Sequence, residues 1–512
     1  MEVSDRARDE LLLGLDVGTT GAKAALFDFS GGLVSIGQAE YDVQHVRPAW
    51  VEQRPEDWWA AAGVAVQRAL EGVRHGPERV AAMAVSSQAP SLVPLDEAGK
   101  SVRPALIWMD RRADAEARHL AEEIGFEQIC HVTGNRPDPF YVAAKLLWFK
   151  KHEPELFKRS ARFVQINGYI NFRLTGAFSM DPVHAALLQL RDCATDEWSP
   201  ELCGACGVDP RQFPKITPCH QIIGEVTRAA AEATGLKPGL PVVTGTVDGS
   251  AAALEAGVTR PGIAAEMTGT STVLLMPRAG GAREPAFINM PHALPNLDLQ
   301  LAAMVASGAS LRWFRQEFCL SEPRDGDPYD HLTSEASTAP PGSGGLIFLP
   351  YMMGERSPIW HTDARGVFFG LSLSTPRAAI VRSILEGTAY ALRHNAEVAA
   401  NAGVEIQEVR LVGGGAKSDL WNQIKADVLG IPVCLPEVSA GAPFGDAVLA
   451  GMGLGRYGNP EKSVASMVRI RKRYEPVRER TQLYDGLYPV FRRVYEHLRE
   501  DFDVVAGLQQ ND

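Results

Sequence analysis

The sequence predicts an α/β fold of two domains, and three observations carry that prediction. Strand patterns alternate with helix patterns along the whole chain rather than falling into separate blocks. The chain has 512 residues, of which 45% are apolar, and chains of this length usually divide into at least two cores. An apolar strand, a Gly-Thr-Thr or Gly-Thr-Ser turn and a second apolar strand occur near residue 14 and again near residue 264. This repeat indicates an internal duplication.

The first half opens with two predicted strands, 11–16 and 22–29, and the Ser-Gly-Gly sequence at 30–32 predicts a hairpin turn into a third. A helix is expected from Pro55 to about Gly72, because proline and acidic residues suit the first turn of a helix. The later elements of this half are expected at 79–87 (strand), 241–246 (strand) and 248–255 (helix).

The second half repeats the opening, with strands at 263–267 and 272–276 on either side of a tight turn at 268–271. The elements expected after the Ser/Pro/Gly-rich stretch 333–345 are a strand at 346–349, a long helix from Pro376 to about Ala402, a strand at 409–414, a helix from Lys417 and a strand at 431–435. We therefore expect an N-terminal domain at 1–247, a C-terminal domain at 248–490 and a terminal helix or tail at 491–512.

The charge and cysteine content exclude several classes of protein. The 51 basic and 62 acidic side chains give a net charge of −11, which argues against nucleic acid or an anionic membrane as a partner. No run approaches the 18 or so apolar residues of a spanning helix, and the N-terminus lacks the pattern of a secretion signal. Seven cysteines are too sparse for a disulfide scaffold. We expect a cytoplasmic protein with reduced thiols.

The turn after the first strand has the residue types of a phosphate site. Gly18, Thr19 and Thr20 supply backbone N–H groups and hydroxyls at a point where glycine lets a ligand approach the backbone closely. Asp16, at the end of the strand, could bind a divalent cation through water. An acidic hairpin turn with no ligand is the alternative, but the second copy, Gly269-Thr270-Ser271, favours the phosphate interpretation.

Two further positions are candidates for the chemistry of a site. Gly413-Gly414-Gly415-Ala416 joins a strand to a helix, where a flat ring or a ribose could lie on the backbone, and Asn422 one turn later could hydrogen-bond an adenine edge; a close packing turn is the alternative. Asp248 begins a helix directly after a strand. Its carboxylate could accept a proton from an alcohol, although a helix N-cap is the common structural role of such an aspartate.

Several standard catalytic motifs are absent from the sequence. There is no G-x-x-x-x-G-K-[ST] phosphate loop and no H-E-x-x-H zinc motif. The glycines at 451–455 break the dinucleotide-binding pattern, and the 269–273 run lacks the last glycine of a nucleophile elbow. Hydride transfer, zinc proteolysis and serine hydrolysis are therefore disfavoured.

Taken in order, these motifs resemble those of the FGGY carbohydrate kinases, relatives of hexokinase, actin and the Hsp70 ATPase. The resemblance runs from about residue 11 to about residue 490, and within the family it is nearest to the xylulokinases. It is most specific in four stretches: LGLDVGTTGAKAALFD, FYVAAKLLWFKKHEPELF, LPYMMGERSPIWHTDARGVFFGLSLSTPRAAIVRSILEGTAYALR and LVGGGAKSDLWNQIKADVLGIPV.

The resemblance implies two actin-like domains, each on a sheet of ribonuclease-H type, with a nucleotide and sugar cleft between them. It implies an ATP-dependent and Mg²⁺-dependent kinase of a sugar hydroxyl, with Asp248 as catalytic base and Asp16 as the residue near magnesium. The cofactor contacts it implies are Gly18, Thr19, Thr20, Lys23, Gly269, Thr270, Ser271, Gly414, Gly415, Ala416 and Asn422. Some relatives form homodimers, which nothing in this sequence decides.

The acceptor is less well determined than the reaction. Xylulokinases commonly have Gly-Gln-Met-His-Gly where this chain has Ser-Gln-Ala-Pro-Ser at 87–91, so the Met-His pair that touches a ketose is absent. The candidate substrate contacts are Gln88, Ala89, Pro90, Trp108, Asp110, Arg111 and Asp248. For Arg111 a solvated charge, and for Trp108 a core position, are the alternatives. We expect a pentulose as acceptor, with another polyol (a tetritol, hexulose or glycerol) or a non-catalytic actin-like nucleotide-binding regulator as the alternatives.

Overall fold

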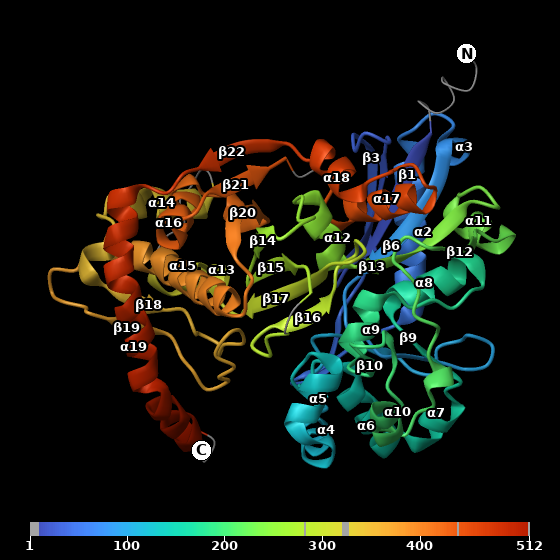
Figure 1. The fold of residues 1–512 in the computed structure, drawn as a ribbon, viewed down its shortest axis with the longest axis horizontal. Helices are drawn as coiled ribbons and strands as arrows, with labels where there is room; N and C mark the ends of the chain where they lie inside the picture. The colour runs from blue at the N-terminus through green and yellow to red at the C-terminus, as the bar shows by residue number, and fades with distance from the viewer. Residues whose placement is uncertain (1–9, 281–282, 320–326, 438–439, 510–512) are drawn as a thin grey trace. The chain divides into compact units, whose positions relative to one another are not determined.

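The computed structural model describes residues 10–280, 283–319, 327–437 and 440–509, and Figure 1 shows its elements in chain order. The chain forms two compact units. Unit 1 contains residues 1–259, 289–299 and 438–468, and unit 2 contains residues 260–288, 300–437 and 469–512. The domains expected from the sequence are continuous segments, whereas the units are not: 248–259 and 438–468 belong to unit 1. The first nine residues of the expected N-terminal domain and the last three of the expected tail lie outside the described residues.

Unit 1 is built on a mixed six-stranded sheet, in which three strands in the middle pair parallel and the strands on both sides of them pair antiparallel. Its order is β12 (Ile222–Glu225), β13 (Pro241–Val247), β6 (Val80–Ser87), β1 (Leu11–Val17), β2 (Gly21–Phe27) and β3 (Leu33–Glu40). These strands confirm the predicted elements at 11–16, 22–29, 79–87 and 241–246.

Successive side chains of β1 point to opposite faces of the sheet, so they contact different helices. Leu13 and Leu15 belong to the core that includes α2 (Pro55–Glu71). Gly14 faces the other way, toward α17 (Ala442–Gly453), where a Cβ on Gly14 would lie 1.9 Å from the Pro443 carbonyl oxygen. Asp16 shares the face of Gly14 because side chains two apart on a strand point to the same side. The strand thus brings its one carboxylate to the α17 side of the sheet.

A second, largely helical core completes unit 1. Its main helices are α4 (Asp114–Leu120), α5 (Phe126–Thr133), α6 (Val142–His152), α9 (Pro182–Leu188) and α10 (Pro200–Cys206). Helix α8 (Ile166–Thr175) belongs to the core of the sheet, and α12 (Asp248–Glu255) is a further helix of the unit. The first helical turn of α12 follows β13 without a loop, as the sequence predicts, and α12 packs against α17.

The sheet of unit 2 has seven strands. Its order is β16 (Ile288–Pro291), β17 (Asp298–Met304), β15 (Thr272–Arg278), β14 (Gly262–Thr268), β20 (Ile406–Val412), β21 (Val433–Pro436) and β22 (Ile470–Tyr474). The helices of this unit are α13 (Ser307–Phe318), α14 (Pro328–Ser337), α15 (Arg377–Asn401), α16 (Asp419–Leu429) and α19 (Arg478–Gln509). The predicted long helix from Pro376 and the predicted strands at 263–267 and 272–276 are confirmed.

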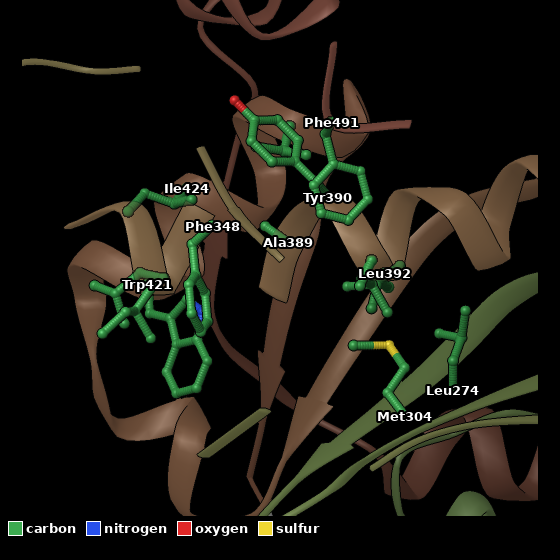
Figure 2. Close-up of a cluster of buried hydrophobic side chains, with 14 of the residues drawn as sticks. Leu274, Met304, Phe348, Ala389, Tyr390, Leu392, Trp421, Ile424 and Phe491 are labelled. Atoms are coloured by element: carbon green, nitrogen blue, oxygen red, sulfur yellow. The ribbon is translucent and has the colours of Figure 1, made fainter. Parts of the chain in front are cut away.

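The core of unit 2 packs aromatic residues of its helices against its sheet. Figure 2 shows Tyr390 of α15 beside Phe491 of α19, with ring centroids 5.4 Å apart. Trp421 of α16 lies in the same cluster and is 4% exposed. Its indole N–H donates to the Thr388 hydroxyl at 3.2 Å, so this ring is fixed both by packing and by a hydrogen bond.

The two sheets confirm the internal duplication that the sequence indicates. In unit 1, β1 pairs antiparallel with β2 and parallel with β6. In unit 2, β14 pairs antiparallel with β15 and parallel with β20. Each hairpin carries one of the two Gly-Thr turns, so the same local fold presents each candidate phosphate site.

Candidate active site

The first Gly-Thr turn is held by backbone and side-chain hydrogen bonds in unit 1. The Gly18 N–H donates to the Gly21 carbonyl at 3.0 Å, and the Tyr41 hydroxyl donates to the Gly18 carbonyl at 2.5 Å. Thr20 is exposed and Thr19 is half-buried. Lys23 lies opposite Asp16 in the β1–β2 register, so its ammonium group is close to that carboxylate. The turn therefore offers amides, hydroxyls and one cation beside Asp16.

Asp248 is the first residue of α12, and the N-cap position is taken by Val247. A capping aspartate would accept from an N–H two or three residues later. The Asp248 carboxylate instead accepts from the adjacent Gly249 N–H at 2.6 Å, and the side chain is half-buried. This geometry does not match the structural alternative of an N-cap, and it leaves the second carboxylate oxygen of Asp248 without a partner inside its own helix.

Asp16 lies close enough to Asp248 to raise the proton affinity of the Asp248 carboxylate. Burial raises the pKa of Asp248 to about 7, with the nearby Asp16 charge as the second cause. Burial raises the pKa of Asp16 to about 6, and the Ser86 hydrogen bond and the Lys23 charge oppose that rise. Burial, followed by the charges of Asp16 and Asp248, also raises the pKa of Tyr41 above its ordinary range. A carboxylate with a pKa near neutrality is suited to accept a proton at physiological pH.

Sequence reasoning missed Asp446 and Tyr41. Asp446 is fully buried in α17, and its carboxyl lies 2.7 Å from the Ser86 hydroxyl, which also contacts Asp16 at 3.2 Å. No motif marks Asp446, which comes 430 positions after Asp16 in the chain. The small residues around it, in the run Gly-Ala-Pro-Phe-Gly-Asp, were the available signal of a helix that packs closely on its neighbours.

Three of the predicted contacts meet at the Thr19 hydroxyl. The Trp108 indole N–H donates to Thr19 Oγ1 at 3.1 Å, and Thr19 Oγ1 donates to Gln88 Oε1 at 3.1 Å. The Gln88 amide also donates to the Gly18 carbonyl and to Gln53. Gln88 is 1% exposed and thus links the end of β6 to the turn, while the half-buried Trp108 retains surface for a ligand.

The other predicted substrate residues differ in how accessible they are. Asp110 is fully buried and accepts from the Val51 N–H at 2.7 Å and from the Arg112 guanidinium. Arg111 is 33% exposed and pairs with Asp138 at 2.7 Å. Ala89 is half-buried, and Pro90 is buried after a cis peptide bond. Arg111 and Ala89 can reach a ligand, whereas Asp110 holds its own segment in place.

Unit 2 contains a cavity of about 340 Å³ beside the second Gly-Thr turn. The turn is exposed, and the Ala309 N–H donates to the Thr270 carbonyl at 2.9 Å, which ties the turn to α13. The residues that line the cavity are Thr268, Gly269, Thr270, Gly308, Leu311, Arg312, Asp327, Tyr329, Asp330, Thr333, Gly414, Gly415, Lys417, Ser418 and Trp421. Four predicted nucleotide contacts, Gly269, Thr270, Gly414 and Gly415, are thereby brought together.

The predicted contacts Ser271, Ala416 and Asn422 are not part of this lining. Asn422 is fully buried, and its amide donates to the Ala416 carbonyl at 2.8 Å and to the Tyr474 hydroxyl at 3.3 Å. Asn422 is therefore a buried residue that stabilises the glycine loop at 413–416. Arg312, Tyr329 and Lys417 line the cavity instead, and the sequence did not single them out, because two of them come from helices with no recognisable motif.

A buried ion pair lies under the second turn. Lys425 contacts both carboxylate oxygens of Glu266, at 2.9 and 2.7 Å, and the two residues are 2% and 1% exposed. The Thr268 hydroxyl donates to Glu266, and the Lys425 ammonium lies 4.7 Å from the centre of the Trp421 ring. This network connects the strand before the turn to an aromatic wall of the cavity.

The residues around Asp16 are compatible with magnesium. Within the described ranges, no group of three or more His, Cys, Asp and Glu side chains is placed to hold a metal ion. Magnesium, however, is commonly bound through one or two carboxylates, several waters and the phosphates of a nucleotide. The half-buried Asp16, two residues before the Gly-Thr-Thr turn, provides a carboxylate of that type. In the part of the chain that the structure describes, we found no helix with the length and apolarity needed to cross a bilayer.

Comparison with known proteins decides the family. Residues 11–255 match the N-terminal domain of the FGGY family of carbohydrate kinases, and residues 264–454 match its C-terminal domain. The chain belongs to the FGGY family of carbohydrate kinases. It is 31% identical to the xylulose kinase of Escherichia coli (strain K12), over 95% of this chain and 99% of that one.

Other FGGY kinases are similar over the same length. The gluconokinase of Bacillus subtilis (strain 168) is 28% identical over 98% of each chain. The crystal structure of xylulose kinase from Rhodospirillum rubrum matches with a TM-score of 0.90 and 31% identity, over 96% of this chain and 100% of that chain. The two-unit α/β fold is therefore that of this family, and the protein is a sugar kinase that uses ATP.

Proposed function

We propose that this FGGY kinase transfers the γ-phosphoryl group of ATP to a hydroxyl of a pentulose, with Asp248 as the general base. The observation that carries the proposal is the half-buried Asp248 carboxylate beside Asp16, with a pKa raised to about 7. An ordinary aspartate, ionised down to pH 3.8, is a weak base at neutral pH. Asp248 combines a higher proton affinity with access to solvent, as a general base requires.

In the proposed reaction, the phosphoryl group moves from ATP to the acceptor, and the hydroxyl proton moves from the acceptor to Asp248. The acceptor oxygen forms a bond to the γ-phosphorus as the bond to the ADP oxygen breaks, and the hydroxyl proton passes to Asp248. The Gly18, Thr19 and Thr20 turn and Lys23 provide hydrogen-bond donors and positive charge to phosphate oxygens. Magnesium, when bound near Asp16, would supply further neutralisation of the phosphate charge.

We assign nucleotide binding to the cavity of unit 2. Gly269 and Thr270 lie at one part of its lining and Gly414 and Gly415 at another, where exposed backbone permits close approach. Arg312 and Lys417 add two cations suited to phosphate oxygens, and the aromatic faces of Tyr329 and Trp421 suit a purine ring.

The sugar and nucleotide cleft between domains, a homodimer, a cytoplasmic location and the lack of nucleic-acid or membrane partners stay predictions.

A pentulose is the acceptor that the relatives favour, since similar proteins along the full chain are named xylulose kinases. The gluconokinases among the relatives make a sugar acid the second candidate. Arg111, 33% exposed, is a cation near the predicted substrate contacts that could bind a carboxylate, but it already pairs with Asp138. That pairing favours a neutral sugar.

The acceptor can be identified by measuring ADP release with Mg-ATP and a panel of pentuloses, hexuloses, tetritols, glycerol and gluconate. We expect a pentulose to give the highest kcat/KM. Preference for gluconate would replace the pentulose assignment with a sugar acid. Nucleotide binding without any acceptor-stimulated turnover would support the non-catalytic regulator instead.

The base is tested by Asp248→Asn. We expect kcat to fall by a factor of about 10³ or more while the Kd for ATP stays within about threefold of the wild type, because general-base catalysis contributes about 10²–10⁴-fold and the nucleotide cavity lies in unit 2. Asp42→Asn, an exposed aspartate of the same unit, is the matched control. Retained turnover in a folded Asp248→Asn protein would refute the assignment.

A further inference from the structure

Asp446 is a third carboxyl in the neighbourhood of Asp16 and Asp248, and close packing holds it there. A Cβ on Gly445 would lie 2.2 Å from the Ala251 carbonyl oxygen, so α17 touches the backbone of α12. On its other side α17 touches β1 at Gly14 in the same way. Asp446 is 0% exposed, and its carboxyl lies 2.7 Å from the Ser86 hydroxyl. The Asp446 carboxyl is therefore enclosed by protein atoms.

The hydrogens around Ser86 can be counted. Ser86 Oγ lies 2.7 Å from Asp446 Oδ2 and 3.2 Å from Asp16 Oδ1. A serine hydroxyl has one hydrogen and can donate to only one of these two oxygens. Both contacts are hydrogen bonds only if one of the two carboxyl groups is protonated and donates to Ser86 Oγ.

Burial and partners indicate which carboxyl carries the proton. Asp446 Oδ1 is buried and, among the described residues, has no hydrogen-bond partner. An orphaned oxygen costs much more in an ionised carboxylate than in a neutral acid. Asp16 is half-buried and lies opposite Lys23, whose charge favours its ionised form.

We propose that Asp446 is a neutral carboxylic acid that donates to Ser86 Oγ and thereby directs the only hydroxyl hydrogen of Ser86 to Asp16. Asp446 is a positioning residue in this arrangement, because it acts on Asp16 through Ser86 and does not reach the substrate. The chain of bonds fixes which Asp16 oxygen is occupied by the protein and leaves the other for a ligand. It also limits the three aspartates of the cluster to at most two negative charges.

The ionisable groups that face Asp446 come from several elements. They are Asp16 on β1, Asp248 on α12 and Cys219 before β12. Lys23 on β2 acts on Asp16, and Glu255 lies on α12. Glu255 accepts from the Ala440 and Gly441 N–H groups just before α17. Burial, with Asp16 and Asp248 as further causes, raises the pKa of Asp446 well above its ordinary value, while the Ser86 bonds oppose the rise. Lys23 lies opposite Asp16 in the sheet register, and its charge lowers the pKa of Asp16.

Infrared spectroscopy tests the protonation state without any substrate. A difference spectrum between the wild type and Asp446→Asn at pH 7.5 should show the loss of a protonated carboxylic acid band. Loss of a carboxylate band instead would overturn the proposal. The inference depends on the proposed function only for its catalytic consequence, so this measurement remains decisive even if no sugar is phosphorylated.

Kinetics test the positioning role. Asparagine has an N–H that can replace the carboxyl donor, so we expect Asp446→Asn to keep kcat/KM for the acceptor within about threefold and to leave its pH profile unmoved. Asp446→Leu and Ser86→Ala break the chain of bonds, and we expect kcat to fall about 10- to 100-fold, as for other residues that orient a metal-binding group, with the KM for ATP unchanged. A double Ser86→Ala, Asp446→Leu variant should lose no more than either single change.

The control is Ser383→Ala, which removes a buried hydroxyl bonded only within α15 of unit 2. Two outcomes would overturn the proposal. One is an Asp446→Asn variant as impaired as Asp446→Leu. The other is a pH profile of Asp446→Asn displaced to lower pH by about one unit, as expected if a negative charge beside Asp16 and Asp248 had been removed.

Discussion

The raised pKa of Asp248 predicts that its removal stabilises the free protein in a pH-dependent way. In the folded chain this pKa is about 7, against 3.8 for an ordinary aspartate. Between these pH values the folded state holds a proton that the unfolded chain has already released, so stability falls as pH rises from about 4 to about 7. Asp248→Asn cannot ionise and avoids that loss. The variant should therefore match the wild type near pH 4 and exceed it at pH 8.

The magnitude follows from the size of the shift. The difference of 3.2 units between 7 and 3.8 corresponds to at most about 4 kcal/mol at about 1.4 kcal/mol per unit. Part of it belongs to the interaction with Asp16, which titrates with Asp248, and the side chain is half-buried, so solvent screens some of the cost. We expect a stabilisation of about 1–3 kcal/mol at pH 8, or an increase in Tm of about 1–5 °C.

Thermal unfolding of both proteins at pH 4.5 and pH 8, without nucleotide or sugar, measures this effect. The expected result is a higher Tm for Asp248→Asn at pH 8 and a difference about a quarter as large at pH 4.5. Asp42→Asn, with an exposed side chain in the same unit, should show no such pH dependence. A stabilisation equal at both pH values, or a loss of stability at pH 8, would refute the conclusion that burial and Asp16 disfavour the Asp248 charge.

Two further predictions concern the nucleotide cavity. A Cβ at Gly308 would lie 2.1 Å from the Gly269 carbonyl oxygen. Gly308→Ala should therefore displace the second turn and raise the KM for ATP by about 10- to 100-fold. An unchanged KM in steady-state kinetics would mean that this turn does not hold the nucleotide. Lys425→Met removes the ion-pair partner of the buried Glu266 carboxylate and should lower the free energy of unfolding of unit 2, measured by urea denaturation, by about 3–5 kcal/mol. The double variant Lys425→Met, Glu266→Leu should recover most of the lost stability. Equal losses in the single and double variants would show that the ion pair is not the cause.

Local patterns in the sequence were sufficient for most of the fold. Alternating or continuous apolar runs located β1, β2, β6, β13, β14 and β15 because each strand lies in the interior of a sheet. The repeated Gly-Thr turn indicated the duplication that the two sheets share. What the sequence could not indicate is that α17, far along the chain, returns to pack on β1, because a close contact between Gly14 and Pro443 leaves no local pattern at either residue.

The candidate site was predicted where function depends on one segment and was missed where it depends on several. Asp16 and Asp248 follow directly from strand ends. Gln88 and Asn422 have the chemistry of ligand contacts, but their amides are occupied by Gly18, Gln53 and Ala416 in the folded chain. Hydrogen-bond partners of this kind depend on tertiary packing. The prediction of a site residue from its type alone therefore cannot separate a group that binds a ligand from one that supports the binding loop.

The duplicated hairpins show how one local fold can serve two chemical roles. Aligned on Gly18 and Gly269, the position of Asp16 corresponds to Met267, so unit 2 lacks a carboxylate where unit 1 has one. The carboxylate nearest to the second turn is Glu266, which is 1% exposed and neutralised by Lys425. In unit 1 the half-buried Asp16 has no such direct ion pair among the described residues and shares its neighbourhood with Asp248 and Asp446. Proton transfer and metal binding require accessible carboxylates whose ionisation can change, whereas phosphate binding is weakened by a free negative charge. The different environments of the carboxylates at the two turns thus support the proposal that acid–base chemistry belongs to unit 1 and nucleotide binding to unit 2.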